Sequence, residues 1–140
     1  MLIRRPAKDV FLALTDPAVT TKFWFTKSSA PLAAGTKVRW DWEMYGAFAD
    51  IDVIEIIPDE KISFQWDQPP RRVEIMLKPL EQGTYVMVRE SGYSETGVEL
   101  TAAIKDSTGG FTTMLDAMKA WLEHGIQLNL VADKFRDVKF

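Results

Sequence analysis

The sequence predicts an α+β domain in which a curved antiparallel β-sheet wraps around one long C-terminal helix. Apolar and polar residues alternate in successive short segments between about residues 35 and 91, with only turns between them. This pattern is typical of an antiparallel meander. Near the C-terminus the apolar period becomes that of a helix. An antiparallel sheet needs a cover on one face, and the late amphipathic helix can supply it.

The N-terminal part predicts one short strand and two short helices. Residues 2–5 are extended up to a proline. Apolar residues at helical spacing then predict a helix over about residues 7–15. Asp16 can cap a second helix and Pro17 can occupy its first position, so this helix is expected over about residues 17–22.

Five strands are expected next, most of them with apolar side chains on one face and polar ones on the other. In the fifth, Tyr85 and Met87 make the opposite face apolar as well. They cover residues 37–44, 49–53, 61–66, 73–77 and 84–91. Glycine or proline lies in each of the intervening segments, as hairpins and loops require. The sheet is therefore expected to be a meander of sequential neighbours.

A polar loop is expected over residues 93–108, followed by the long helix. The helix carries an apolar stripe with spacing i, i+4, i+7, i+11, formed by Phe111, Leu115, Met118 and Leu122. We expect this stripe to pack on the concave face of the sheet. One domain is then expected over residues 1–132, with a loosely held tail over 133–140.

Composition excludes several classes of protein. The chain has 140 residues, no cysteine, one histidine and a net charge of −3. Disulfides, thiolate nucleophiles and cysteine-type zinc sites are therefore excluded, and a basic nucleic-acid footprint is not expected. No apolar run approaches the length of a membrane span and no signal peptide is visible. A cytoplasmic location is expected, with no cofactor and no metal.

Five phrases occur in a fixed order along nearly the whole chain. They are RPAKDVFLALTDP (5–17), GTKVRWDW (35–42), VIEIIPDEKISFQW (53–66), TYVMVRESG (84–92) and GFTTMLDAMKAWLEHG (110–125). In order and spacing they resemble the START-like (SRPBCC) superfamily of helix-grip folds, and within it the homologues of the heat-shock-protein-90 ATPase activator. The resemblance implies a deep apolar cavity between sheet and helix. It also implies relatives that bind lipids, polyketides, hormones or aromatic compounds, some of them cyclases or hydrolases.

The candidate ligand-binding residues are mainly aromatic side chains on the apolar faces of the predicted strands. They are Trp40, Trp42, Phe64 and Trp66, together with Ile75 and Met118. A hydrophobic ligand needs such walls with a few polar groups to orient it. The alternative interpretation is that these side chains simply fill the core.

Glu90 is the candidate polar group of the cavity. It continues the side of its strand that carries Val86 and Val88. If that side faces the helix, a dry setting would favour a neutral acid able to donate a hydrogen bond or a proton. The alternative is a carboxylate at the surface or the cavity mouth, paired with an arginine such as Arg39 or Arg72.

Three other features carry weaker signals. His124, close to the end of the long helix, complements the helix dipole more readily than it forms a catalytic base. The acids between residues 41 and 52 alternate with apolar residues, which indicates a solvated sheet face. Gly109-Gly110 before the predicted helix could bind an anion, but it lacks the context of a phosphate-binding loop and is better explained as a hinge or a close contact.

Three functions remain open from the sequence. The favoured one is binding of a hydrophobic small molecule without covalent chemistry. The second is a cyclase- or hydrolase-like enzyme that uses the same cavity, with Glu90 as acid or base. The third, suggested by the resemblance alone, is a co-chaperone-like ATPase activator, and it ranks last. A homodimer stays open as well.

Overall fold

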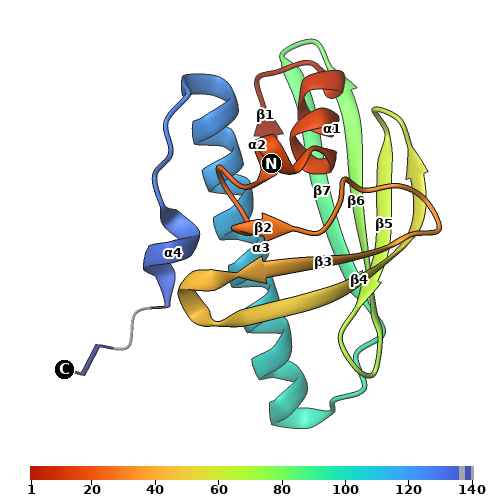
Figure 1. Cartoon of the computed structure of the whole chain (residues 1–140), viewed down its shortest axis with the longest axis vertical. Coiled ribbons are helices and arrows are strands. Elements are labelled where there is room, and N and C mark those ends of the chain that lie inside the picture. Colours follow the sequence, from red (N-terminus) through yellow and green to blue (C-terminus); the bar gives the residue numbers. More distant parts are fainter. Residues whose placement is uncertain (136–137, 140) are drawn as a thin grey trace.

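The computed structural model describes residues 1–135, 138 and 139, and it confirms the α+β architecture. A seven-stranded antiparallel sheet of order β1-β7-β6-β5-β4-β3-β2 curves around the long helix α3 (Figure 1). The strands are β1 (Leu2–Ile3), β2 (Lys27–Ser28), β3 (Lys37–Trp42), β4 (Ala47–Ile57), β5 (Lys61–Trp66), β6 (Arg71–Leu80) and β7 (Gly83–Ser91). The helices are α1 (Ala7–Thr15), α2 (Pro17–Thr20), η1 (Glu43–Tyr45), α3 (Gly97–His124) and α4 (Leu130–Lys134).

Strands β3 to β7 form the expected meander, each pairing with its neighbour in the chain. The pairing of β4 with β5 shifts between Val53 and Glu55, where a β-bulge interrupts the ladder. A bulge bends its strand and increases the local twist. The sheet therefore curves enough to leave a concave face for α3.

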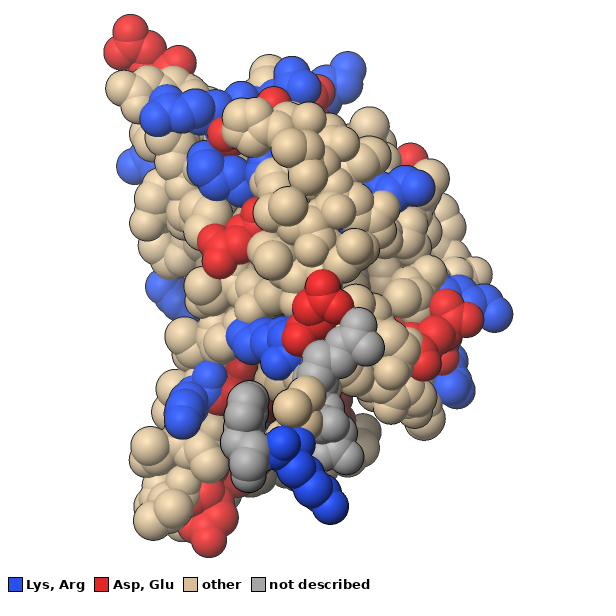
Figure 2. All heavy atoms as spheres, turned by 90° about the vertical axis from the view of Figure 1, so that its left-hand side faces the viewer, with Lys and Arg blue, Asp and Glu red and all other residues tan. Residues whose placement is uncertain are grey.

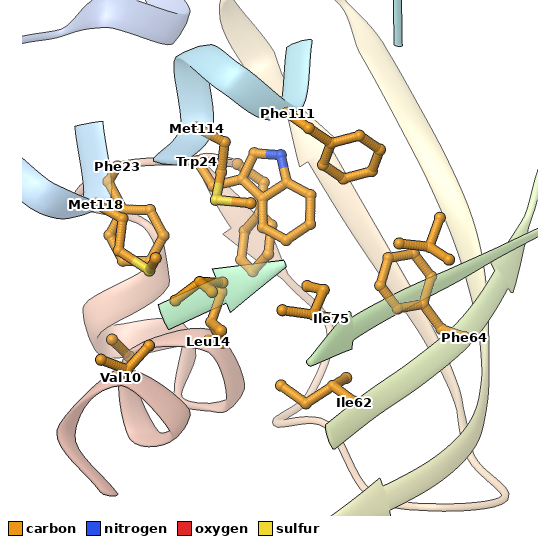
Figure 3. Packing of buried hydrophobic residues seen from close by; sticks show 14 of the residues in the cluster. Val10, Leu14, Phe23, Trp24, Ile62, Phe64, Ile75, Phe111, Met114 and Met118 are labelled. Atoms are coloured by element: carbon orange, nitrogen blue, oxygen red, sulfur yellow. The ribbon is translucent and has the colours of Figure 1, made fainter. Parts of the chain in front are cut away.

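The core lies between that concave face, α1 and the second half of α3 (Figure 3). Val10 and Leu14 of α1 and Met118 of α3 are at most 1 % exposed. They meet strand residues such as Phe64 and Ile75, which are equally buried. Each such side chain contributes about 1.5–3 kcal/mol relative to an exposed one. Phe111 and Met118 of the predicted stripe are buried and Leu115 and Leu122 are partly buried against the core, so the stripe faces the sheet as expected.

The long helix begins at Gly97, and the loop expected over residues 93–108 is therefore wrong for its greater part. Good helix formers occupy the start of α3. Apart from Gly109, the half-buried residues there follow helical spacing and continue the stripe: Leu100, Ala103, Ser107 and Gly110. Gly109 and Gly110 cost the helix about 1 kcal/mol each relative to alanine, which a helix of 28 residues tolerates.

Smaller differences from the expected elements have local causes. Met44 lies in the 3-10 helix η1 instead of the end of a strand. Strand β6 runs through Pro79, where the missing amide is harmless because the pairing with β5 has already ended at Met76. Strand β2 has two residues and helix α4 has five, and neither was expected.

The C-terminal segment contacts the body of the domain as far as the structure describes it. Lys134 Nζ donates to the carbonyl of Gly109 and, at 2.6 Å, to Thr113 Oγ1. The ring of Phe135 lies 6.0 Å from that of Tyr45, between centroids. Part of the expected tail, residues 136, 137 and 140, lies outside the described residues.

Acidic and basic side chains are interspersed on the face shown in Figure 2, which includes the side of α3. Such mixing differs from the basic stripe that nucleic acids require. Within the described part of the chain, each helix is too short or too polar to cross a membrane.

Candidate functional site

The candidate site is centred on Glu90, near the end of β7. Val86, on the same side of the strand, is completely buried, whereas Tyr85 and Met87 on the other side are 44 % and 47 % exposed. Side chains alternate between the faces of a strand, so Glu90 lies on the concave side with α3.

The carboxylate of Glu90 accepts hydrogen bonds from three separate segments. Trp66 Nε1 of β5 donates at 2.7 Å, the hydroxyl of Tyr93 donates at 2.5 Å, and the hydroxyl of Ser107 donates from α3. Glu90 is the acceptor in all three hydrogen bonds. A carboxylate offers about four lone-pair sites, which leaves room for a further donor.

A second charged group lies beside this carboxylate. Arg71 donates to Glu95, lies 3.6 Å from Asp67 between Nη1 and Oδ2, and stacks over the ring of Tyr93 at 4.5 Å. The arginines considered as partners of Glu90 pair elsewhere. Arg39 lies 3.2 Å from Asp41 and Arg72 lies 3.7 Å from Glu74, so the alternative that invoked them finds no support here.

The pKa values of two neighbours reflect this arrangement. Burial raises the pKa of Asp67, and the negative charges of Glu90 and Glu95 raise it further, against the opposing effect of Arg71. Burial also raises the pKa of Tyr93, and the hydrogen bond to Glu90 acts in the same direction. Both shifts are those expected where negative charge is concentrated in a partly dry place.

A pocket of about 320 Å³ lies between the concave face of the sheet and the middle of α3. We call it the tryptophan pocket, and its lining includes Trp24, Trp42, Trp66, Glu90, Phe111 and Phe135. Trp24 and Phe111 lie side by side with ring centroids 6.1 Å apart (Figure 3). The pocket thus combines aromatic walls with the carboxylate of Glu90.

A second hollow, of about 480 Å³, lies on the other side of Ser107, between the edge of β7 and the first half of α3. We call it the edge groove, and its lining includes Met1, Val88, Ile104 and Thr112. Glu90, Ser107 and Phe111 line both hollows. The hydrogen bond between Glu90 and Ser107 therefore lies at the boundary between them.

The structure divides the sequence-predicted site residues into two groups. Trp42, Trp66 and Glu90 line the tryptophan pocket. The other four are at most 1 % exposed and belong to the packed core: Trp40, Phe64, Ile75 and Met118. Alternation identified the inward face of each strand, but it could not tell which inward residues lie beneath a packed helix and which border a hollow.

Several pocket residues were missed from the sequence. Trp24 belongs to the aromatic cluster of residues 23–25, a visible signal that had no assigned place in the fold. Asp106 and Ser107 fall in the segment that was expected to be a loop, where helical spacing from Leu100 onward is the signal that could have found them. Arg71 and Tyr93 follow from the tertiary arrangement alone.

The weaker sequence signals have structural explanations. His124 is the last residue of α3 and is exposed. Gly109 and Gly110 lie inside α3, so they do not form a helix N-terminus that could bind an anion. Among the described residues, no group of three or more acidic or histidine side chains is arranged to hold a metal ion.

Comparison with solved structures supports the fold. A protein from Staphylococcus saprophyticus, SSP2350, is 28 % identical, with 91 % of each chain covered and a TM-score of 0.79. DynU16, a protein in the dynemicin biosynthetic locus, is 24 % identical over 91 % of this chain and 46 % of its own, with a TM-score of 0.80. The Aha1 dimer from Colwellia psychrerythraea is 20 % identical over 89 % of this chain and 93 % of its own, with a TM-score of 0.76.

Comparison with curated proteins gives no match. The family model described as Activator of Hsp90 ATPase homolog 1-like protein matches residues 4–123. That range runs from the end of β1 almost to the end of α3 and includes every strand from β2 to β7. The chain therefore belongs to the family of Activator of Hsp90 ATPase homolog 1-like proteins.

Proposed function

We propose that the protein binds an apolar small molecule in the tryptophan pocket, with the carboxylate of Glu90 as its polar anchor. The observation that carries the proposal is the position of Glu90, held by three donors at the boundary of a pocket with aromatic walls. Ligand sites combine such apolar walls with a few fixed polar groups. Volumes from about 300 Å³ upward are ordinary for such sites, and the pocket has about 320 Å³.

The anchoring of Glu90 supports a binding role over a purely structural one. A structural carboxylate is usually paired with a cation or solvated at the surface. Glu90 is instead held by an indole and two hydroxyls, so its orientation is set in advance. Pre-set polar groups raise affinity because less freedom is lost on binding.

The other functions considered from the sequence receive no specific support. Catalysis by Glu90 would need a substrate proton within reach, which only a bound substrate can define. The Colwellia relative is a dimer by its description, but at 20 % identity it supports the fold alone. A cytoplasmic location stays a prediction.

Binding is tested with a neutral fluorescent probe, N-phenyl-1-naphthylamine, and with two variants of α3 that each place a phenylalanine side chain in one of the two hollows. Gly110 lines the tryptophan pocket, and a Cβ atom built there has no neighbour within 4 Å. Gly110→Phe should therefore fill the pocket without disturbing the core, and reduce probe affinity by about tenfold or more. Thr112→Phe is the matched control, because Thr112 is exposed and lines only the edge groove of the two.

The two phenylalanine variants would show the opposite pattern of probe binding if the ligand site were the edge groove. Loss of binding with Thr112→Phe and not with Gly110→Phe would move the site to the edge groove and contradict the proposal. Equal binding by the parent and both variants would also contradict it. Native mass spectrometry of the purified parent, with Gly110→Phe as control, shows whether a ligand is retained from the cell.

A further inference from the structure

We infer that the ligand of the tryptophan pocket is an organic cation, an aromatic or aliphatic ammonium compound, and that carboxylate ligands are rejected. This inference rests on the proposed function and adds to it the charge of the ligand. Two independent features of the pocket support it: the aromatic character of its walls and the sign of the charges around it.

The aromatic walls suit a cation. Trp24, Trp42 and Trp66 line one pocket together with Phe111. Indole and phenyl faces carry negative electrostatic potential, and they attract ammonium groups within about 6 Å. The indole N–H of Trp66 donates to the negative Glu90 at 2.7 Å, which polarises the ring and increases the electron density on its face.

The charges of the pocket are mainly negative. Its lining contains three acids, Asp67, Glu90 and Asp106, and one base, Arg71, for a sum of −2. Arg71 is already matched by Asp67 and by Glu95, which lies just outside the lining. Asp106 lies at the exposed rim of the pocket and makes no hydrogen bond or ion pair with the rest of the described chain, so its charge can act on a ligand at the mouth.

Burial is the main cause of the raised pKa of Asp67, Arg71 opposes it, and repulsion from the negative charges of Glu90 and Glu95 adds to it. An ammonium group in the pocket would relieve this repulsion, whereas a carboxylate would add to it. The same field that favours a cation therefore disfavours fatty acids and other anionic amphiphiles.

The test uses three probes that share a benzyl group and a tetrahedral head. Benzyltrimethylammonium is positive, neopentylbenzene is its neutral carbon isostere, and phenylmethanesulfonate is negative. We expect the cation to bind roughly tenfold more tightly than the neutral isostere. The sulfonate should bind more weakly than either. The readout is the indole N–H signal of Trp66 in a nitrogen–proton correlation spectrum, assigned with Trp66→Phe.

Charge variants separate attraction by the pocket from general attraction by the protein. Asp106→Asn should weaken binding of the cation by about two- to fivefold and leave the affinity for the neutral probe unchanged. Asp116→Asn removes the same charge from an exposed position of the same helix, outside the lining, and should leave all three affinities unchanged.

The outcomes distinguish this inference from the proposed function. If the neutral isostere binds as tightly as the cation, the inference is wrong while the binding function stands. Tighter binding of the sulfonate would overturn it in the same way. If no probe moves the Trp66 signal and N-phenyl-1-naphthylamine does not bind, both proposals fail together.

Discussion

The two halves of α3 differ in what they contribute. In the second half, from Phe111 onward, Met114 and Met118 are completely buried against the sheet. In the first half, every residue from Gly97 to Gly110 is half-buried or exposed. The same helix thus closes the core with its second half and borders the tryptophan pocket and the edge groove with its first half and its middle.

The connections to the N-terminal segment follow the same division. Lys119 Nζ donates to the carbonyl of Leu2 at 2.8 Å, and Glu123 accepts from the backbone amide of Arg4 at 2.7 Å. Both residues lie in the second half of α3. The comparison teaches that the second half of the helix is anchored to the N-terminal segment, whereas the first half is held through Ser107, which donates to Glu90, and through the carbonyl of Gly109, which accepts from Lys134.

The largest expected change in the free energy of unfolding comes from comparing one substitution in each half of α3. Met118→Asp places an unpaired charge in the core and should lower the free energy of unfolding by roughly 4–5 kcal/mol. Ile104→Asp, at a position 44 % exposed in the first half, should change it by less than about 0.5 kcal/mol. Urea denaturation measures both. If Met118→Asp fails to fold, Met118→Ala gives a graded loss of about 2–4 kcal/mol.

Equal effects at positions 104 and 118 would contradict the division of the helix into two halves.

A change of intermediate size in the free energy of unfolding is expected for substitution of Glu123. Its pKa is lowered: burial alone would raise it, but Lys119 at 2.5 Å and the amide of Arg4 favour the charged form more strongly. A lowered pKa means that the folded state binds the proton less tightly, so the stabilisation is present above pH 4.5 and is lost as the pH falls through the folded pKa. Glu123→Gln should cost about 1–2 kcal/mol at neutral pH.

The pH series provides the control for this variant. The difference between the parent and Glu123→Gln should shrink as the pH falls below 4.5. Glu99→Gln, at an exposed position in the first turn, should change stability by less than about 0.5 kcal/mol at any pH. A Glu123 variant whose deficit stays constant at acid pH would argue against the ionic contribution.

The smallest effect concerns the two glycines between the halves. Gly110→Ala adds a methyl group with no neighbour within 4 Å and should stabilise the protein by about 1 kcal/mol through helix propensity. Gly109→Ala should gain less, because its Cβ atom would lie 3.1 Å from Lys134 Nζ. Thermal unfolding of both variants measures the difference. A destabilised Gly110→Ala would contradict the helical conformation and the open space that the structure gives to residue 110.

The parts of the fold that were predicted well are those in which the apolar period is unbroken. Strand β5 (Lys61–Trp66) and helix α1 (Ala7–Thr15) have the expected bounds, because their periods continue to the last residue. The first half of α3 escaped prediction because its helical spacing is carried by residues that are only partly buried, and several of them are small or polar. The glycine pair at 109–110 then resembled a boundary.

The site could be predicted only in part for a related reason. Trp42, Trp66 and Glu90 lie on strands whose inward faces follow from alternation. Trp24 and Ser107 reach the same pocket from segments far away in the sequence, and their positions depend on how α3 and residues 23–25 pack against the sheet. No local pattern contains that information.

The absence of fully buried side chains between Gly97 and Gly110 has an evolutionary consequence. Substitutions at exposed positions usually change stability by no more than about 0.5 kcal/mol. Exposed pocket residues such as Asp106 can therefore change during divergence while the core keeps its shape. A lineage can then acquire a new ligand without first acquiring compensating core mutations. The relative from Staphylococcus saprophyticus, with 28 % identity at a TM-score of 0.79, shows how far sequences diverge on this scaffold.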